Sequence, residues 1–166
     1  MAKKEVAFSL FWRTFALLLL FSGSVVLYVR QALQPALPSQ AGLDALVSSS
    51  QVTVSEEKYG WSFQPRARVK AGFAFYPGGL VSPIAYAPLM KAIAQKGYRV
   101  ALLSLPYNLA VSAQAKAREP IEQQPQLQWA VGGHSLGGVV ALNYALSNAE
   151  IKAVVLWAGY PQGDQS

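Results

Sequence analysis

The sequence predicts an α/β protein with a doubly wound, mostly parallel sheet and helices on both faces, preceded by one N-terminal transmembrane helix. Four short apolar runs begin at residues 69, 98, 127 and 151, which is the spacing of strand–helix–strand units of about 30 residues. Strands that are apolar along almost their whole length indicate a sheet covered on both faces, as parallel sheets are. The right-handed crossover rule then places the intervening helices on both sides. A further apolar stretch near the N-terminus predicts the transmembrane helix.

The composition excludes several classes of function. The chain has 166 residues, of which 52% are hydrophobic and 13% charged, and its net charge is +6. The absence of cysteine excludes disulfides, a thiol nucleophile and thiolate metal ligands, and a single histidine argues against a histidine-rich metal site. The basic residues are scattered and form no stripe with aromatic residues, so nucleic-acid binding is not expected. We expect neither a metal nor another cofactor.

Residues 1–30 are predicted to form a membrane anchor. The stretch Val6–Val29 is apolar except for Arg13, and a spanning helix needs about 20 apolar residues. It is long enough if the Arg13 side chain extends toward the lipid headgroups. Lys3, Lys4 and Arg13 all lie on its N-terminal side, which predicts a cytoplasmic N-terminus and an extracytoplasmic domain.

Two alternatives to an uncleaved anchor exist. The stretch could be a signal peptide cleaved near Ser39-Gln40-Ala41, which would release a secreted protein, although this site lies far beyond the apolar run. It could also be a buried core helix, but it is apolar all round. Residues 31–50, which contain Pro35 and Pro38, are predicted to be a linker. Residues 51–166 then form the domain.

Within the domain, apolar runs and turn signals predict the following elements in order. The expected strands are Gln51–Val54 and Tyr59–Phe63, which form an opening hairpin, and then Val69–Tyr76, Tyr98–Leu105, Leu127–Val131 and Ile151–Trp157. The expected helices run from Ser82-Pro83, or only from Pro88, to Gly97, from Ala113 to Gln123 with an interruption at Pro120, and from Leu136 to Asn148.

A Gly-x-Ser-x-Gly motif centred on Ser135 lies between the third apolar run and the last helix. A strand before it and a helix after it are the context of a nucleophile elbow, where a serine sits on a strained turn. Gly133 and Gly137 remove side chains that would clash with the helix, and the helix N-terminus favours developing negative charge. Alternatively, Ser135 only caps the helix. His134 is not expected to be its base, because neighbouring side chains at a tight turn point apart.

Residues 69–164 resemble the alpha/beta-hydrolase fold, most closely its fold-5 type, in which a membrane segment before the domain is common. The resemblance rests on five motifs: Phe75-Tyr76-Pro77-Gly78-Gly79, Pro83-Ile84-Ala85-Tyr86-Ala87-Pro88-Leu89, Asn108-Leu109-Ala110-Val111, Gly132-Gly133-His134-Ser135-Leu136-Gly137-Gly138, and Leu156-Trp157-Ala158-Gly159-Tyr160-Pro161. It implies a serine hydrolase in which Ser135 attacks an ester or similar acyl bond of a small-molecule substrate. It also implies an oxyanion hole made by the N–H of Leu136 and that of Gly78 or Gly79; otherwise the two glycines form only a tight turn.

The sequence departs from the family's order of serine, acid and histidine, because no histidine follows Ser135. Asp164 stands where some hydrolases carry the acid, and is otherwise a loop aspartate. Three readings remain open: a serine hydrolase truncated at its C-terminus, with acid and base beyond Ser166; a non-catalytic binding domain of the same fold; and an acyltransferase that uses the same serine. We expect the first, and we expect residues 1–166 alone to be inactive.

Overall fold

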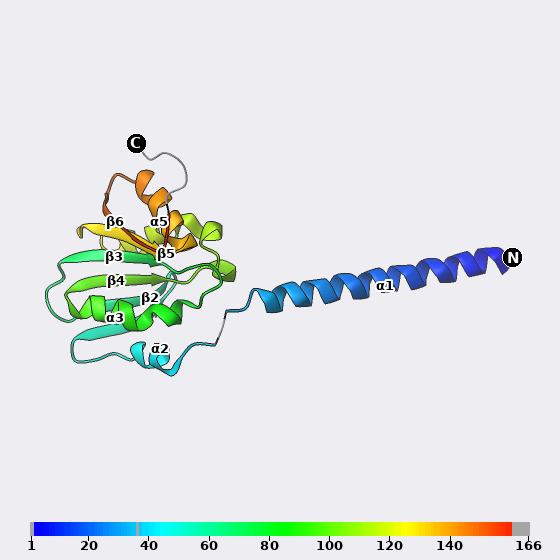
Figure 1. Ribbon diagram of the computed structural model, residues 1–166, viewed down its shortest axis with the longest axis horizontal. Helices are drawn as coiled ribbons and strands as arrows, with labels where there is room; N and C mark the ends of the chain where they lie inside the picture. The colour runs from blue at the N-terminus through cyan, green and yellow to red at the C-terminus, as the bar shows by residue number, and fades with distance from the viewer. Residues whose placement is uncertain (1, 36, 161–166) are drawn as a thin grey trace. The chain divides into compact units, whose positions relative to one another are not determined.

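The computed structural model describes residues 2–35 and 37–160, and the chain divides into two units at the Gln34–Pro35 bond. The first unit is the helix α1 (Ala2–Ala32), drawn in blue in Figure 1. Its segment Trp12–Ala32 has 21 residues, a mean hydropathy of 1.6 and no buried part. This length and composition suit either a membrane anchor or a signal sequence.

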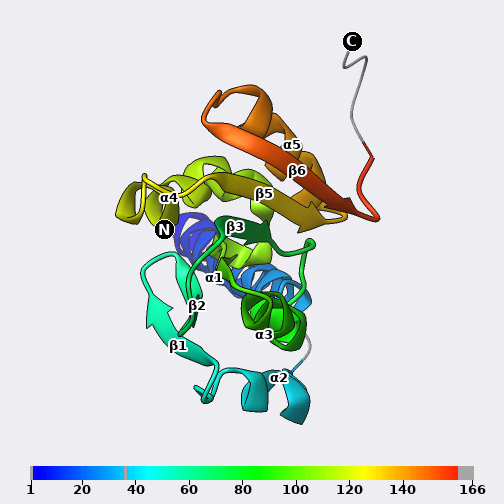
Figure 2. The same ribbon diagram turned by 90° about the vertical axis from the view of Figure 1, so that its left-hand side faces the viewer.

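The second unit contains a six-stranded sheet with the order β1-β2-β4-β3-β5-β6. Figure 1 labels β4 between β2 and β3, and Figure 2 labels β1 at one edge and β6 at the other. Its strands are β1 (Val52–Glu57), β2 (Gly60–Pro65), β3 (Ala71–Tyr76), β4 (Tyr98–Leu103), β5 (Trp129–His134) and β6 (Ile151–Trp157). The β1–β2 hairpin joins β4 antiparallel, whereas β4, β3, β5 and β6 are mutually parallel. The predicted α/β class is therefore confirmed, with the antiparallel pair at one edge and β6 at the other among the described strands.

Helices cover both faces of this sheet, as predicted. On one face, α3 (Ala87–Gln95) buries Ala87, Met90 and Ala94 in a cluster that includes Phe73 of β3. On the other face, α5 (Leu136–Leu146) shares a cluster with Ala74, the next residue of β3. Successive strand residues point to opposite faces, so the apolar run of β3 supplies both halves of the core.

Two helical segments differ from the prediction. The first begins as a 3-10 turn, η1 (Pro83–Tyr86), before α3 starts at Ala87 and places Pro88 in its first turn, where a missing N–H costs nothing. The second comprises 3-10 turns, η2 (Pro106–Asn108) and η3 (Ala110–Ala117), followed by α4 (Arg118–Gln123). The predicted interruption at Pro120 is wrong, because Pro120 occupies the first turn of α4, and the irregular residue in the preceding segment is Ala113.

The segment 31–50, expected to be a linker, contains a short helix, α2 (Gln40–Ala45). Ser39 caps it, accepting a hydrogen bond from the Gly42 N–H at 3.2 Å. Gly42 approaches η1 so closely that an added Cβ would lie 2.8 Å from the carbonyl oxygen of Ile84. Ala45 is buried in the same cluster as α3, so this helix is a packed part of the second unit.

Candidate active site

Ser135 lies on the turn between β5 and α5, at the carboxyl edge of the parallel strands. Its φ of 51° and ψ of −122° put a non-glycine residue in a region that costs energy. The turn is held because the Ser135 N–H donates to the carbonyl oxygen of Trp157, at the end of β6, at 2.8 Å. The side chain is exposed and makes no capping hydrogen bond to the helix. The hydroxyl therefore stands free at the N-terminus of α5.

The two glycines of the motif lie where backbone meets backbone. An added Cβ on Gly133 would come closer than 3.0 Å to main-chain atoms of Gly137 and Gly138. One on Gly137 would do the same to the carbonyl oxygens of Tyr76 and Pro77, at the end of β3. The backbone of the elbow thus packs directly against the end of β3 as well as against α5. The contact with β3 could not be predicted from the motif alone.

The loop that follows β3 contains Gly78 and Gly79, is called the glycine loop below, and lies beside the elbow. An added Cβ on Gly79 would be 3.4 Å from the Leu136 side chain. Among the described residues, neither the Gly79 N–H nor the Leu136 N–H, the first of α5, donates a hydrogen bond to another group. The Gly78 N–H is already engaged, because it donates to the Tyr86 hydroxyl at 3.2 Å.

His134 packs beside the elbow with its ring against that of Tyr86. Its Nδ1 lies 3.0 Å from the Tyr86 hydroxyl oxygen, and the two ring centroids are 5.9 Å apart. Burial raises the pKa of Tyr86, and the hydrogen bond from Gly78 partly offsets this. Tyr86 was not singled out from the sequence; it lay within a motif of the family resemblance, but no local pattern marked its hydroxyl.

The acid suggested by the sequence, Asp164, lies outside the described residues. Among the side chains that the structure describes, in residues 12–35, 37–110 and 113–160, no group of three His, Asp or Glu is placed to hold a metal ion. The one histidine of the sequence has its Nδ1 directed at Tyr86. The described residues thus present a serine and two backbone donors, without a histidine hydrogen-bonded to the serine.

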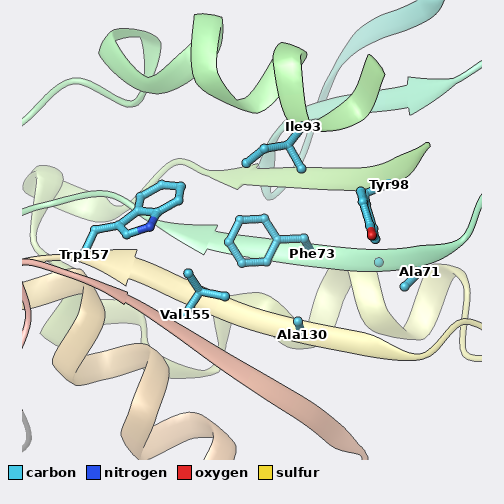
Figure 3. A pocket seen from close by; sticks show the side chains of 8 residues that line it. Ala71, Phe73, Ile93, Tyr98, Ala130, Val155 and Trp157 are labelled. Atoms are coloured by element: carbon cyan, nitrogen blue, oxygen red, sulfur yellow. The ribbon is translucent and has the colours of Figure 1, made fainter. Parts of the chain in front are cut away.

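An apolar cavity of about 230 Å³ lies on the α3 face of the sheet (Figure 3). It is lined by Ala71, Gly72, Phe73, Ile93, Tyr98, Ala130, Val155 and Trp157. Phe73 and Trp157 pack edge to face across it, with ring centroids 6.4 Å apart. Among the described residues, no serine, histidine or carboxylate lines this cavity, and Ser135 is not part of it.

A model of the alpha/beta hydrolase family matches residues 72–166. Among solved structures, TT1662 from Thermus thermophilus is similar, with a TM-score of 0.55 and 19% identity over 68% of this chain and 60% of that one. Carboxyl esterase 2 from Tuber melanosporum gives a TM-score of 0.47 and 20% identity over 66% of this chain and 46% of that one. A soluble variant of monoglyceride lipase from Saccharomyces cerevisiae, in complex with a substrate analog, gives a TM-score of 0.48 and 14% identity over 69% of this chain and 46% of that one.

The chain spans 46% to 60% of the length of these three structures. No curated protein matches its sequence significantly. The family match covers more than half of the 166 residues and includes the whole elbow. The chain therefore belongs to the alpha/beta hydrolase family.

Proposed function

We propose that the protein is a serine hydrolase that cleaves an ester or a related acyl bond of a small-molecule substrate, with Ser135 as the nucleophile. The observation that carries this proposal is the strained conformation of an exposed serine at a helix N-terminus. Such strain persists only where the surroundings enforce it, and it gathers at active sites. A serine that merely capped α5 would need neither the strain nor the free hydroxyl.

In the proposed reaction, Ser135 Oγ forms a bond to the acyl carbon while its proton passes to a general base. The carbonyl electron pair moves onto oxygen, and the N–H groups of Leu136 and Gly79 stabilise the resulting oxyanion. Collapse of this intermediate breaks the bond to the leaving alcohol, which takes the proton from the base. Water then releases the acyl group by the same steps, so atoms and charges balance over the cycle.

We propose that the base, and the acid that orients it, come from residues outside 1–166. The alternative candidate for the acid is Asp164. We do not assign the base to His134, because among the described residues its ring makes no hydrogen bond to the Ser135 hydroxyl and its Nδ1 lies 3.0 Å from the Tyr86 hydroxyl oxygen, not near a carboxylate. Two other functions remain in competition. An acyltransferase would need a water-poor pocket around a serine that is exposed in the described part of the chain. A non-catalytic binding domain would not account for the strained backbone conformation of Ser135.

Residues 1–166 alone should hydrolyse a short-chain aryl ester far more slowly than the complete protein. Loss of the base from a serine triad costs up to about 10⁶ in turnover. The fragment should also self-associate, because β6 ends the described sheet and its outer edge offers unpaired N–H and C=O groups. Ester hydrolysis and size-exclusion chromatography of both chains check this. A monodisperse fragment with the turnover of the complete protein would overturn the expectation.

We further propose that α1 is an uncleaved, single-span anchor and that the domain lies outside the cytoplasm. Lys3, Lys4 and Arg13 precede most of the apolar stretch, and positive residues stay on the cytoplasmic side. Protease added to spheroplasts should therefore digest the domain, while the triple variant Lys3→Glu, Lys4→Glu, Arg13→Glu should leave a larger fraction protected. Full protection of the unmodified domain would reverse the topology, and a soluble product beginning after α1 would indicate a cleaved signal.

A further inference from the structure

We propose that Tyr86 and His134 are positioning residues that fix the glycine loop so that the Gly79 N–H, and not the Gly78 N–H, serves as the second oxyanion donor. The proposal rests on the proposed function, since an oxyanion donor matters only if Ser135 forms a tetrahedral intermediate. It also assigns a role to the single histidine of the sequence, which the triad leaves unused.

The first step is the chain of hydrogen bonds behind the loop. The Gly78 N–H donates to the Tyr86 oxygen at 3.2 Å, and that oxygen lies 3.0 Å from His134 Nδ1. Among the described residues the Tyr86 hydroxyl has no other acceptor within hydrogen-bond reach. In the proposed relay, the Tyr86 hydroxyl donates its proton to Nδ1, so Nδ1 is the acceptor and the ring carries its proton on Nε2. The relay runs from Gly78 N–H through Tyr86 O–H to His134.

Both members of the pair are held by packing. The Tyr86 ring lies against Phe75 of β3, with centroids 5.1 Å apart, and Phe75 in turn packs against Trp157 of β6 at 4.9 Å. His134 is the last residue of β5 and pairs with Trp157 across the sheet. The relay therefore joins the glycine loop to the strand residue that directly precedes Ser135.

The loop has little freedom to take another position. An added Cβ on Gly78 would lie 2.7 Å from His134 Nδ1 and 3.0 Å from the Tyr86 oxygen. Beyond it, the Leu80 N–H donates to the carbonyl oxygen of Asn108 at 2.8 Å, and Leu80 has a φ of 58°. Gly79 is thus fixed on both sides, beside Leu136, while its own N–H is free to bind an oxyanion.

The consequence for catalysis follows from the geometry. Two backbone donors stabilise an oxyanion only if both point at it before the reaction begins. Removal of the Tyr86 hydroxyl frees the Gly78 N–H and lets the loop shift, which misplaces the Gly79 donor without deleting it. Loss of a whole oxyanion donor costs about 10²–10³ in rate, so misplacing one should cost less, on the order of 10-fold.

The test uses the complete protein in detergent micelles and the Tyr86→Phe variant, which keeps the ring on Phe75 and removes only the hydroxyl. The rate constant for fluorophosphonate labelling of Ser135 should fall about 10-fold, with the reversible affinity for the probe unchanged. Tyr98→Phe is the matched control, because it deletes a hydroxyl at the first residue of β4. This residue lies at the amino end of the parallel strands, away from Ser135 at their carboxyl end, so the variant should label at the wild-type rate. Equal rates for Tyr86→Phe and wild type, or an equal loss in Tyr98→Phe, would overturn the proposal.

Two further variants separate positioning from simple packing. Asparagine can place an acceptor oxygen near the position of Nδ1, so His134→Asn should retain most of the labelling rate, whereas the apolar His134→Leu should lose as much as Tyr86→Phe. Nitrogen-15 NMR provides a readout that does not depend on activity. The signal lost in His134→Asn should be a neutral imidazole protonated on Nε2, and Tyr86→Phe should shift its Nδ1 resonance.

These measurements distinguish failure of this inference from failure of the proposed function. A wild-type protein that is never labelled refutes the nucleophile, while the NMR spectrum still tests the relay. A labelled protein whose His134 carries its proton on Nδ1, or whose Tyr86→Phe variant leaves that resonance unchanged, refutes the relay alone.

Discussion

Ser135→Ala should abolish both covalent labelling by a fluorophosphonate and ester turnover in the complete protein. Loss of the nucleophile from a serine hydrolase costs up to about 10⁶ in turnover. The folded state should change little, because the hydroxyl is exposed and caps no helix N–H, and such surface substitutions stay within about 0.5 kcal/mol. Labelling with a fluorescent probe and hydrolysis of a short-chain aryl ester measure the loss.

Two variants make this result specific. Ser147→Ala removes a hydroxyl from the C-terminal end of α5, where it bonds the Asn143 carbonyl oxygen at 3.0 Å, and should retain full labelling. Ser135→Gly should lose activity as completely as Ser135→Ala. Its free energy of unfolding should exceed that of Ser135→Ala by about 1 kcal/mol, since glycine tolerates the positive φ that strains alanine. Undiminished labelling of Ser135→Ala would remove Ser135 from the proposed mechanism.

Gly137→Ala should strongly destabilise the domain. The new Cβ would fall within 3.0 Å of the Tyr76 and Pro77 carbonyl oxygens, which are backbone atoms and cannot rotate away. Relief requires α5 to move off β3, which opens the part of the core between α5 and the sheet. Overpacking alone costs about 1–3 kcal/mol, and we expect a loss at the upper end of this range or beyond. Urea denaturation monitored by tryptophan fluorescence measures it.

Gly79→Ala is the matched control for this prediction. It makes the same chemical change in the loop facing the elbow, but its Cβ would meet the Leu136 side chain at an ordinary 3.4 Å. Its midpoint of urea denaturation should stay close to that of the wild type. A Gly137→Ala protein as stable as Gly79→Ala would show that Gly137 does not lie in close backbone contact with the end of β3.

The sheet could be predicted from the sequence because β3, β4 and β5 are buried on both faces and are therefore apolar along most of their length. The last strand, β6, is also mostly apolar although it is only partly buried. The four runs correspond to β3, β4, β5 and β6, with boundaries displaced by a few residues. The segment 110–123 was harder, because a proline in a first helical turn and one that breaks a helix look alike in sequence. Similarly, α2 was hidden in a segment whose prolines indicated a linker.

Of the site, the elbow was visible in the sequence because its glycines and serine are close neighbours along the chain. The relay was not, because Tyr86 and His134 are 48 residues apart and meet only through the order of the strands. The choice between Gly78 and Gly79 likewise depends on which N–H already has a partner. Adjacent glycines carry no sequence signal that separates them.

Mass spectrometry of the labelled protein tests the assignment of the nucleophile most directly. Trypsin cuts after Arg118 and Lys152, and the peptide between these sites, residues 119–152, contains two serines, Ser135 and Ser147. Fragment ions that bracket the fluorophosphonate adduct therefore identify the modified residue without any mutation. We predict a single adduct on Ser135. An adduct on Ser147 or on a different tryptic peptide, with Ser135 unmodified, would contradict the proposed mechanism.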